Sequence, residues 1–183
     1  MTKADEVLKE IEEKAQNEFL PIVGPTKGKI LVEAIRKAKP KHVLEIGTLI
    51  GYSAILIGRE LDTHSEITTI EIHAKEAEQA EKNIRIAQIS PRIRVIVGDA
   101  LEVIPILRDC FDAVFIDAEK TEYYQYLKLT EDKLHKGTVV IADNAGLFAD
   151  QMREYLEYVR MSGKFSSTYF QVGEDGVEVS SKL

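Results

Sequence analysis

Residues 42–53, HVLEIGTLIGYS, decide the fold of this chain. The run 42–46 is largely apolar and is typical of a buried strand. Gly47 then permits a sharp turn and a close approach of a ligand to the backbone. A helix is expected from Tyr52, and its N-terminus can accept negative charge. We therefore expect a strand, a glycine turn and a helix in succession, with room for a ligand at the turn.

The same alternation of short β-rich runs and longer amphipathic runs continues along the chain. Strands are expected at 66–72, 93–97, 111–116 and 138–142, and helices at 52–61, 74–87, 100–107, 122–134 and 149–161. This pattern is typical of a parallel sheet with helices on both faces. The runs 165–172 and 177–181 flank Gly-Glu-Asp-Gly and predict a hairpin. The sequence thus predicts an α/β fold with a mostly parallel sheet that ends in an antiparallel hairpin.

Two helices are expected before the first strand. Residues 4–18 carry apolar side chains at helical spacing, and Thr26 is expected to cap a second helix that Pro40 ends. No linker or internal repeat divides the chain. We expect one domain at 1–183, with N-terminal helices at 1–40, a βα core at 41–162 and the hairpin at 163–183.

Composition limits the class of protein. The 183 residues are 44% hydrophobic and 30% charged, which is ordinary for a globular protein with its own core. The formal net charge of -7 argues against non-specific binding to nucleic acid. No apolar stretch is long enough to span a membrane, and the charged N-terminus does not resemble a signal peptide. The single cysteine, Cys110, excludes an intrachain disulfide; we expect it to be buried or half-buried and the protein to be cytoplasmic.

Polar side chains end two of the expected strands. Asp117 follows the run 111–116 and precedes Ala-Glu-Lys120, and Asp143-Asn144 follows the run 138–142. Taken singly, Asp117 would be interpreted as a helix cap and Lys120 as a solvated charge. Because the carboxyl ends of parallel strands meet at one edge of a sheet, these groups are expected to converge. Oxygen donors suit a hard divalent cation, so the two segments predict a cation site with a base beside it.

Acidic residues also end the second and third strands. Glu71 lies across from the glycine turn and is placed to accept both hydroxyls of a ribose. Asp99 can accept an adenine amino group, cap the next helix, or do both. The spacing Gly-x-x-x-Gly differs from that of dinucleotide-binding turns. We therefore expect this turn to bind an amino-acid carboxylate in preference to a dinucleotide. His73 is expected at the surface or as a loose adenine contact.

Together these segments resemble the class I S-adenosylmethionine-dependent O-methyltransferases, and among them the cation-dependent catechol and caffeoyl-CoA O-methyltransferase family. The resemblance runs from about Phe19 to the hairpin and includes Lys27-Gly28, Tyr158-Val159-Arg160 and Asp175-Gly176. It implies a Rossmann-like, seven-stranded methyltransferase sheet. It also implies S-adenosylmethionine as cofactor, Mg²⁺ (or Ca²⁺ or Mn²⁺) as metal, and a homodimer.

The resemblance assigns roles to individual residues. Asp117, Asp143 and Asn144 match the metal ligands, and Lys120 matches the general base that takes the proton of the acceptor hydroxyl. Water and two vicinal oxygens of the acceptor would complete the coordination of the metal. The acceptor oxygen then attacks the sulfonium methyl without a covalent enzyme intermediate, so catalysis rests on positioning. The implied cofactor contacts are Val23, Glu45, Gly47, Thr48, Ser53, Glu71, Asp99, Ala100 and Asp117.

The chain departs from the catechol enzymes where these hold their acceptor. It contains no tryptophan, although the family pattern has one at the position of Glu119 and another at Phe19. Phe148 replaces a proline that walls the catechol site, and Tyr169 stands where a carboxylate grips the second hydroxyl. Glu119 near the mouth would disfavour anionic substrates. The pattern therefore predicts the methyl transfer and leaves the acceptor open.

Three interpretations of the function remain. The first is methylation of a small molecule with vicinal hydroxyls, such as a catechol, and the second is methylation of a hydroxylated nucleoside in tRNA. A basic stretch that could hold phosphate favours tRNA and comprises Lys27, Lys29, Arg36, Lys37, Lys39 and Lys41. A solvated helix face explains that stretch more simply, and the acidic net charge weighs against RNA. The third, a degenerate cofactor-binding subunit, is disfavoured by the intact Asp117 and Lys120.

Overall fold

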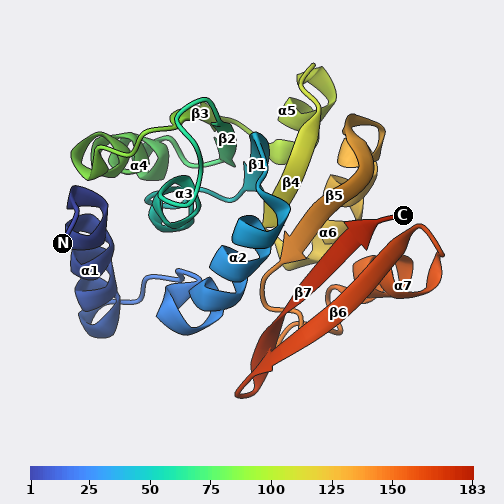
Figure 1. The fold of residues 1–183 in the computed structure, drawn as a ribbon. Coiled ribbons are helices and arrows are strands. Elements are labelled where there is room, and N and C mark those ends of the chain that lie inside the picture. The colour runs from blue at the N-terminus through green and yellow to red at the C-terminus, as the bar shows by residue number, and fades with distance from the viewer.

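Seven strands form one sheet in the computed structural model, which describes residues 1–183 (Figure 1). The strands are β1 (His42–Ile46), β2 (Glu66–Glu71), β3 (Arg92–Val97), β4 (Phe111–Ile116), β5 (Leu134–Ala142), β6 (Phe165–Val172) and β7 (Asp175–Lys182). Their order is β3-β2-β1-β4-β5-β7-β6. Strands β1 to β5 pair in parallel, whereas β7 pairs antiparallel with both β5 and β6. The predicted α/β sheet with an antiparallel C-terminal hairpin is confirmed.

Helices cover both faces of this sheet (Figure 1). They are α1 (Lys3–Asn17), α2 (Gly24–Ala38), α3 (Tyr52–Gly58), α4 (Ala74–Ala87), α5 (Ala100–Ile106), α6 (Tyr123–Thr130) and α7 (Arg153–Met161), with short 3-10 helices η1 (Lys120–Glu122) and η2 (Glu131–Lys133). Helices α1 to α4 contribute to a core cluster of 20 buried residues, and α5 to α7 to a second cluster of 22. Alternate strand residues supply each cluster, with Val43 in the first and Leu44 in the second. No helix combines the length and apolar character that a membrane crossing requires.

Some element boundaries differ from those expected. The helix expected at 122–134 is shorter, because α6 ends at Thr130, whose hydroxyl bonds to Tyr126 O at 2.7 Å, and β5 begins already at Leu134. The helix expected from residue 149 begins at Arg153, after a stretch of turns. The hairpin turn is confined to two residues, since β7 starts at Asp175. In each case the central part of the element is where the sequence placed it.

Two local expectations are wrong. Helix α2 begins at Gly24 with Pro25 in its first turn, so Thr26 lies inside the helix and does not cap it. The end of this helix is as expected: it stops at Ala38, and the capping residue Lys39, whose φ of 48° is left-handed, directly precedes Pro40. Cys110 is exposed, because it lies in the loop that precedes β4 and not within the strand.

A buried ion pair attaches the hairpin to α7. The side chain of Glu178 on β7 is only 1% exposed. It accepts hydrogen bonds from Arg160 Nε at 2.9 Å and Arg160 Nη2 at 2.6 Å, and another from Ser167 Oγ at 2.6 Å. A buried carboxylate without such partners is strongly destabilising. The ion pair therefore fixes the hairpin and, with it, the position of Asp175 at the start of β7.

Gly47 lies where the chain leaves β1, between the ends of β2 and β4. Its φ of +95° lies in the region that favours glycine, and a Cβ atom here would lie 2.2 Å from the carbonyl oxygen of Asp117. Its N–H donates a hydrogen bond to Ile70 O at 3.0 Å. The turn thus requires glycine both for its conformation and for the close approach of the chain that leaves β4.

We predict that Gly47→Ala lowers the free energy of unfolding by roughly 3 kcal/mol or more, since backbone strain and a steric overlap act together. Urea unfolding measures this loss. Gly137→Ala is the matched control, because Gly137 has a φ of +89° but no atom within 4 Å of the added Cβ. Its loss should be only about 1 kcal/mol. Equal losses for the two variants would contradict the close-contact explanation.

Candidate active site

Main-chain hydrogen bonds align the ends of β1, β4 and β5. Asp117 N donates to Ile46 O at 2.9 Å, and Asp143 N donates to Ile116 O at 3.0 Å. Each aspartate is the first residue after its strand and is held in register by the neighbouring strand. The two carboxyl groups are close enough for the charge of Asp117 to act on Asp143. The expected convergence of these two residues at one edge of the sheet is present.

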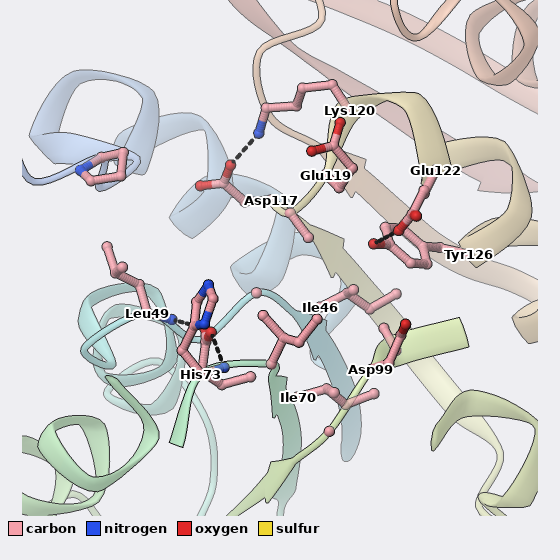
Figure 2. Close-up of a pocket in the computed structure, with 17 residues that line it drawn as sticks. Ile46, Leu49, Ile70, His73, Asp99, Asp117, Glu119, Lys120, Glu122 and Tyr126 are labelled. Carbon is pink, nitrogen blue, oxygen red and sulfur yellow. Dashed lines mark hydrogen bonds and ion pairs between the residues drawn. The ribbon is translucent and has the colours of Figure 1, made fainter. Parts of the chain in front are cut away.

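A cavity of about 580 Å³ lies at this edge, over the carboxyl ends of β1 to β4. Figure 2 shows Asp117 and Lys120 on one side of the space and Leu49 and His73 on the other. The walls comprise Pro21, Ile46, Gly47, Leu49, Ile70, Glu71, Ile72, His73, Gly98, Asp99, Ala100, Asp117, Ala118, Glu119, Lys120, Glu122 and Tyr126. Both the volume and the place are typical of small-molecule sites, because β1 is the point at which the strand order reverses.

Two carboxylates at the strand ends are held by main-chain donors. Glu71 accepts Leu49 N at 2.7 Å with one oxygen and His73 N at 3.0 Å with the other. Asp99 accepts a hydrogen bond from Leu101 N at 2.8 Å. It therefore caps α5, as expected. Each carboxylate oxygen has a second lone pair, so both side chains keep acceptor capacity toward the cavity.

A chain of buried polar groups lies beneath the glycine turn. Glu45 is fully buried, and its Oε2 accepts a hydrogen bond from Thr69 Oγ1 at 2.5 Å. The hydroxyls of Thr69 and Thr48 lie 2.5 Å apart, while Glu45 Oε1 has no hydrogen-bond partner. Burial raises the pKa of Glu45 to about 7, although hydrogen bonds from Ser53 and Thr69 act to lower it. The turn therefore rests on a carboxyl group that holds its proton up to near neutral pH.

Lys120, the first residue of η1, lines the cavity just after β4. Its Nζ lies 2.9 Å from Asp117 Oδ1 and 3.0 Å from the hydroxyl of Tyr123. The dashed contact between Lys120 and Asp117 is visible in Figure 2. The carboxylate and the hydroxyl fix the position of the amine, which is what a proton-transfer group requires.

A second lysine, Lys27 on α2, contacts the end of β5. Its Nζ lies 2.8 Å from each oxygen of Asp143 and 2.8 Å from Asp175 Oδ2. Asn144 Nδ2 donates to the same Asp175 oxygen at 2.9 Å. Burial and then the charge of Asp117 raise the pKa of Asp143 to about 6, whereas Lys27 opposes this shift. Burial acts to raise the pKa of Asp175. Hydrogen bonds from Lys27 and from the loop after β5 outweigh this effect and hold the pKa below its usual range.

The donors at this edge fit a hard divalent cation. No group of three or more Asp, Glu, His or Cys side chains suited to a metal is present; the candidate set has two carboxylates, Asp117 and Asp143, and one amide, Asn144. Asp143 Oδ1 is buried and accepts no hydrogen bond; its only partner is the ionic contact with Lys27 Nζ at 2.8 Å, while Lys27 donates its hydrogen bond to Oδ2. Asn144 gives its Nδ2 to Asp175, so its amide oxygen remains free to act as a ligand. All these donors are oxygen atoms, as Mg²⁺ prefers.

The structure distributes the residues implied by the resemblance over three places. The cavity wall contains Gly47, Glu71, Asp99, Ala100, Asp117 and Lys120. Glu45, Thr48 and Ser53 lie behind the glycine turn, and Val23 lies in the core next to the start of α2. Asp143 and Asn144 lie beside the cavity, on the side of α2 and β7.

Sequence reasoning missed part of the site. The solvated helix face expected for the basic stretch is wrong for Lys27, because this residue pairs with two carboxylates. Glu122 and Tyr126, which line the cavity and share a 2.5 Å hydrogen bond, were not singled out. Their spacing of four residues on η1 and α6 was the only available signal, and such spacing is common on any helix. Pro21 lines the cavity from the α1–α2 loop, which carries no local signal for this role.

Comparison with known proteins defines the class of this one. The fold is that of the class I methyltransferases. The O-methyltransferase from Bacillus cereus in complex with SAH has a TM-score of 0.85 and 28% identity, over 99% of this chain and 90% of that chain. The O-methyltransferase TomG from Streptomyces achromogenes in complex with SAM has a TM-score of 0.87 and 26% identity, over 97% of this chain and 90% of that one.

The sequence places the chain within one family of this class. Residues 2–162 match the family model described as O-methyltransferase, and the chain belongs to that family. Catechol O-methyltransferase B from Danio rerio is 36% identical over 171 residues, which are 86% of this chain and 64% of the relative. Catechol O-methyltransferase from Sus scrofa is 34% identical over 155 residues, covering 81% of this chain and 82% of that protein. The chain thus spans less than two thirds of the fish relative.

We predict that Glu45→Gln changes how stability depends on pH. Between its ordinary pKa of 4.5 and about 7, Glu45 keeps a proton when folded that it loses when unfolded. The free energy of unfolding of the wild type therefore falls as pH rises through this window, by roughly 1.4 kcal/mol per pH unit from this residue, and levels off above it. Urea unfolding at about pH 5, 6 and 7.5 should show the Gln variant gaining stability relative to the wild type. Parallel curves would contradict the assignment.

Proposed function

We propose that this chain is an S-adenosylmethionine-dependent O-methyltransferase that uses a divalent cation and methylates a small molecule with vicinal hydroxyls. The observation that carries the proposal is the amine of Lys120, 2.9 Å from Asp117, at the wall of the cavity that Glu71 and Asp99 also line. A candidate base and a candidate cofactor site thus share one space. Relatives named catechol O-methyltransferase, and similar structures in complex with SAM or SAH, support this reaction class.

The cavity suits the nucleoside part of S-adenosylmethionine. Glu71 can accept both ribose hydroxyls, since its oxygens each keep a free lone pair. Asp99 can accept the adenine amino group while it caps α5. The side chain of Ile72 is 59% exposed on the same wall, and a flat adenine ring would cover it. The cofactor would therefore place its sulfonium methyl toward Lys120 and Asp117.

Asp117, Asp143 and Asn144 would hold the cation, which supplies Lewis-acid polarisation of the acceptor oxygens when bound. Lys120 would take the proton of the acceptor hydroxyl. The resulting ammonium is stabilised by Asp117 at 2.9 Å and kept in place by the Tyr123 hydroxyl at 3.0 Å. An in-line transfer of the methyl group from the sulfonium to the acceptor oxygen would need no covalent bond to any residue of the chain. The protein contributes position and charge.

The acceptor side of the site differs from what the resemblance to the catechol enzymes implies. Glu119 lines the cavity where the catechol enzymes carry an aromatic wall, and Phe19 is 95% exposed. The hydroxyl of Tyr169 donates to Asp175 O at 2.9 Å and gives no carboxylate to a second acceptor hydroxyl. Within the basic stretch, Lys27 is paired with carboxylates, and so is Arg36, whose Nε lies 2.7 Å from Glu60. These pairings support a small acceptor over tRNA.

Methyl-transfer assays with labelled S-adenosylmethionine test the proposal. Catechols, other vicinal diols and tRNA should be offered as acceptors, with Mg²⁺ and with excess chelator. We expect turnover on a small diol that chelator abolishes and added Mg²⁺ restores. Turnover that resists chelator would contradict the role of the cation, and turnover on tRNA alone would contradict the small acceptor.

We predict that Lys120→Met lowers kcat by roughly 10² to 10⁴, the usual contribution of a general base. The affinity for S-adenosylmethionine should stay within about threefold, because Lys120 contacts the reacting end of the site and not the nucleoside end. Calorimetric titration of the cofactor and steady-state kinetics give the two quantities. Lys75→Met, at an exposed position on α4, is the control and should keep wild-type kcat. A Lys120 variant with normal kcat would rule out this base.

A further inference from the structure

Lys27 makes contacts that a surface lysine would not make. Its side chain is 15% exposed, and its ammonium bridges Asp143, which is 2% exposed, and Asp175. The bridge joins α2 to residues 116 and 148 positions later in the chain. Burying a charge is costly unless a partner compensates it, so Lys27 is the group that permits Asp143 to lie ionised in this place.

We propose that Lys27 is a built-in counter-cation: its ammonium neutralises Asp143 when no divalent cation is present and moves wholly onto Asp175 when one binds. Lys27 thereby stabilises the cation-free protein and weakens cation binding. This inference rests on the proposed function, because it concerns the same cation site.

The geometry at Asp143 makes the two cations competitors. Nζ of Lys27 lies 2.8 Å from both Asp143 oxygens, so the ammonium covers the carboxylate that a divalent cation would need. An ammonium and a dication that share one carboxylate repel each other strongly in a poorly solvated place. Cation binding therefore requires Lys27 to withdraw from at least one oxygen.

Asp175 is the alternative ionic partner of Lys27. Its Oδ2 already lies 2.8 Å from the ammonium, so the lysine can leave Asp143 without losing an ionic partner. Asp175 itself is anchored, since its Oδ1 accepts Leu147 N at 3.0 Å and Gly146 N at 3.3 Å. The partner that receives Lys27 is thus fixed in position.

The local charge balance gives the direction of the effect. Three carboxylates (Asp117, Asp143 and Asp175) and two ammonium groups (Lys27 and Lys120) meet at this edge, which leaves a formal charge of about -1. A dication changes this to about +1. Without Lys27, binding of the dication changes the formal charge of this edge from about -2 to zero, which is electrostatically more favourable. Removal of Lys27 should therefore tighten cation binding.

Calorimetric titration of Mg²⁺ and thermal unfolding with and without Mg²⁺ test the proposal on the full chain. We expect Lys27→Met and Lys27→Gln to lower Kd for Mg²⁺ by roughly fivefold or more. They should also lower Tm without the cation and show a larger Mg²⁺-induced rise in Tm than the wild type. Lys27→Arg, which keeps the charge, should stay within about threefold of the wild-type Kd. Lys29→Met, an exposed position on the same helix, is the matched control and should change neither quantity.

Each outcome of these titrations and unfolding experiments either supports or contradicts the counter-cation. An unchanged or higher Kd in the neutral variants, with Tm lowered alone, would show that Lys27 is only a structural partner and would leave the proposed function intact. Neutral variants that fold only when Mg²⁺ is present support the counter-cation, and neutral variants that stay unfolded at saturating Mg²⁺ contradict it. Absence of any Mg²⁺ binding by the wild type, together with chelator-resistant methyl transfer, would overturn this inference and the cation in the proposed function together.

Discussion

The contact between the Gly47 turn and the end of β4 is the constraint on which the candidate site depends. A Cβ atom at Gly47 would lie 2.2 Å from the carbonyl oxygen of Asp117. The main chains therefore touch where β1 and β4 leave the sheet, and no side chain separates them. One wall of the cavity contains Gly47 and, from the neighbouring strand β2, Glu71. The other wall begins at Asp117 and contains Lys120. A bulkier turn would move these walls apart, and the reacting groups with them.

Charge at the same edge is the second feature that shapes the molecule. Parallel strands align two aspartates at neighbouring strand ends, where like charges repel. Two lysines from different elements compensate these charges: Lys120 from η1 and Lys27 from α2. The first lysine lies at the cavity and the second at its back. In the function proposed above, Lys120 would transfer the proton and Lys27 would control the charge of the cation site.

The sequence was most reliable where a single pattern ran without interruption. The helix at 74–87 and the strands at 42–46 and 111–116 have the expected ends, because their apolar periodicity starts and stops at clear signals. It failed where local signals competed. Thr26 has the chemistry of a helix cap, yet Pro25 already suits the first turn, so the helix begins earlier. Strand β5 extends back to Leu134 through a shift in register near Gly137, whose φ is +89°, because pairing with Phe111 of β4 outweighs the helical pattern of the residues before it.

For the site, the sequence by itself determined which residues stand at the ends of the strands. Asp117 and Asp143 had to meet once the strands were parallel and adjacent, since strand ends in such a sheet share one edge. Only the tertiary structure decided what surrounds them. It buried Thr48 against Thr69, left Cys110 exposed, and brought Lys27 to Asp143 and Asp175. Such contacts join residues more than 100 positions apart, and they depend on how helices and hairpin pack on the sheet, which no local spacing encodes.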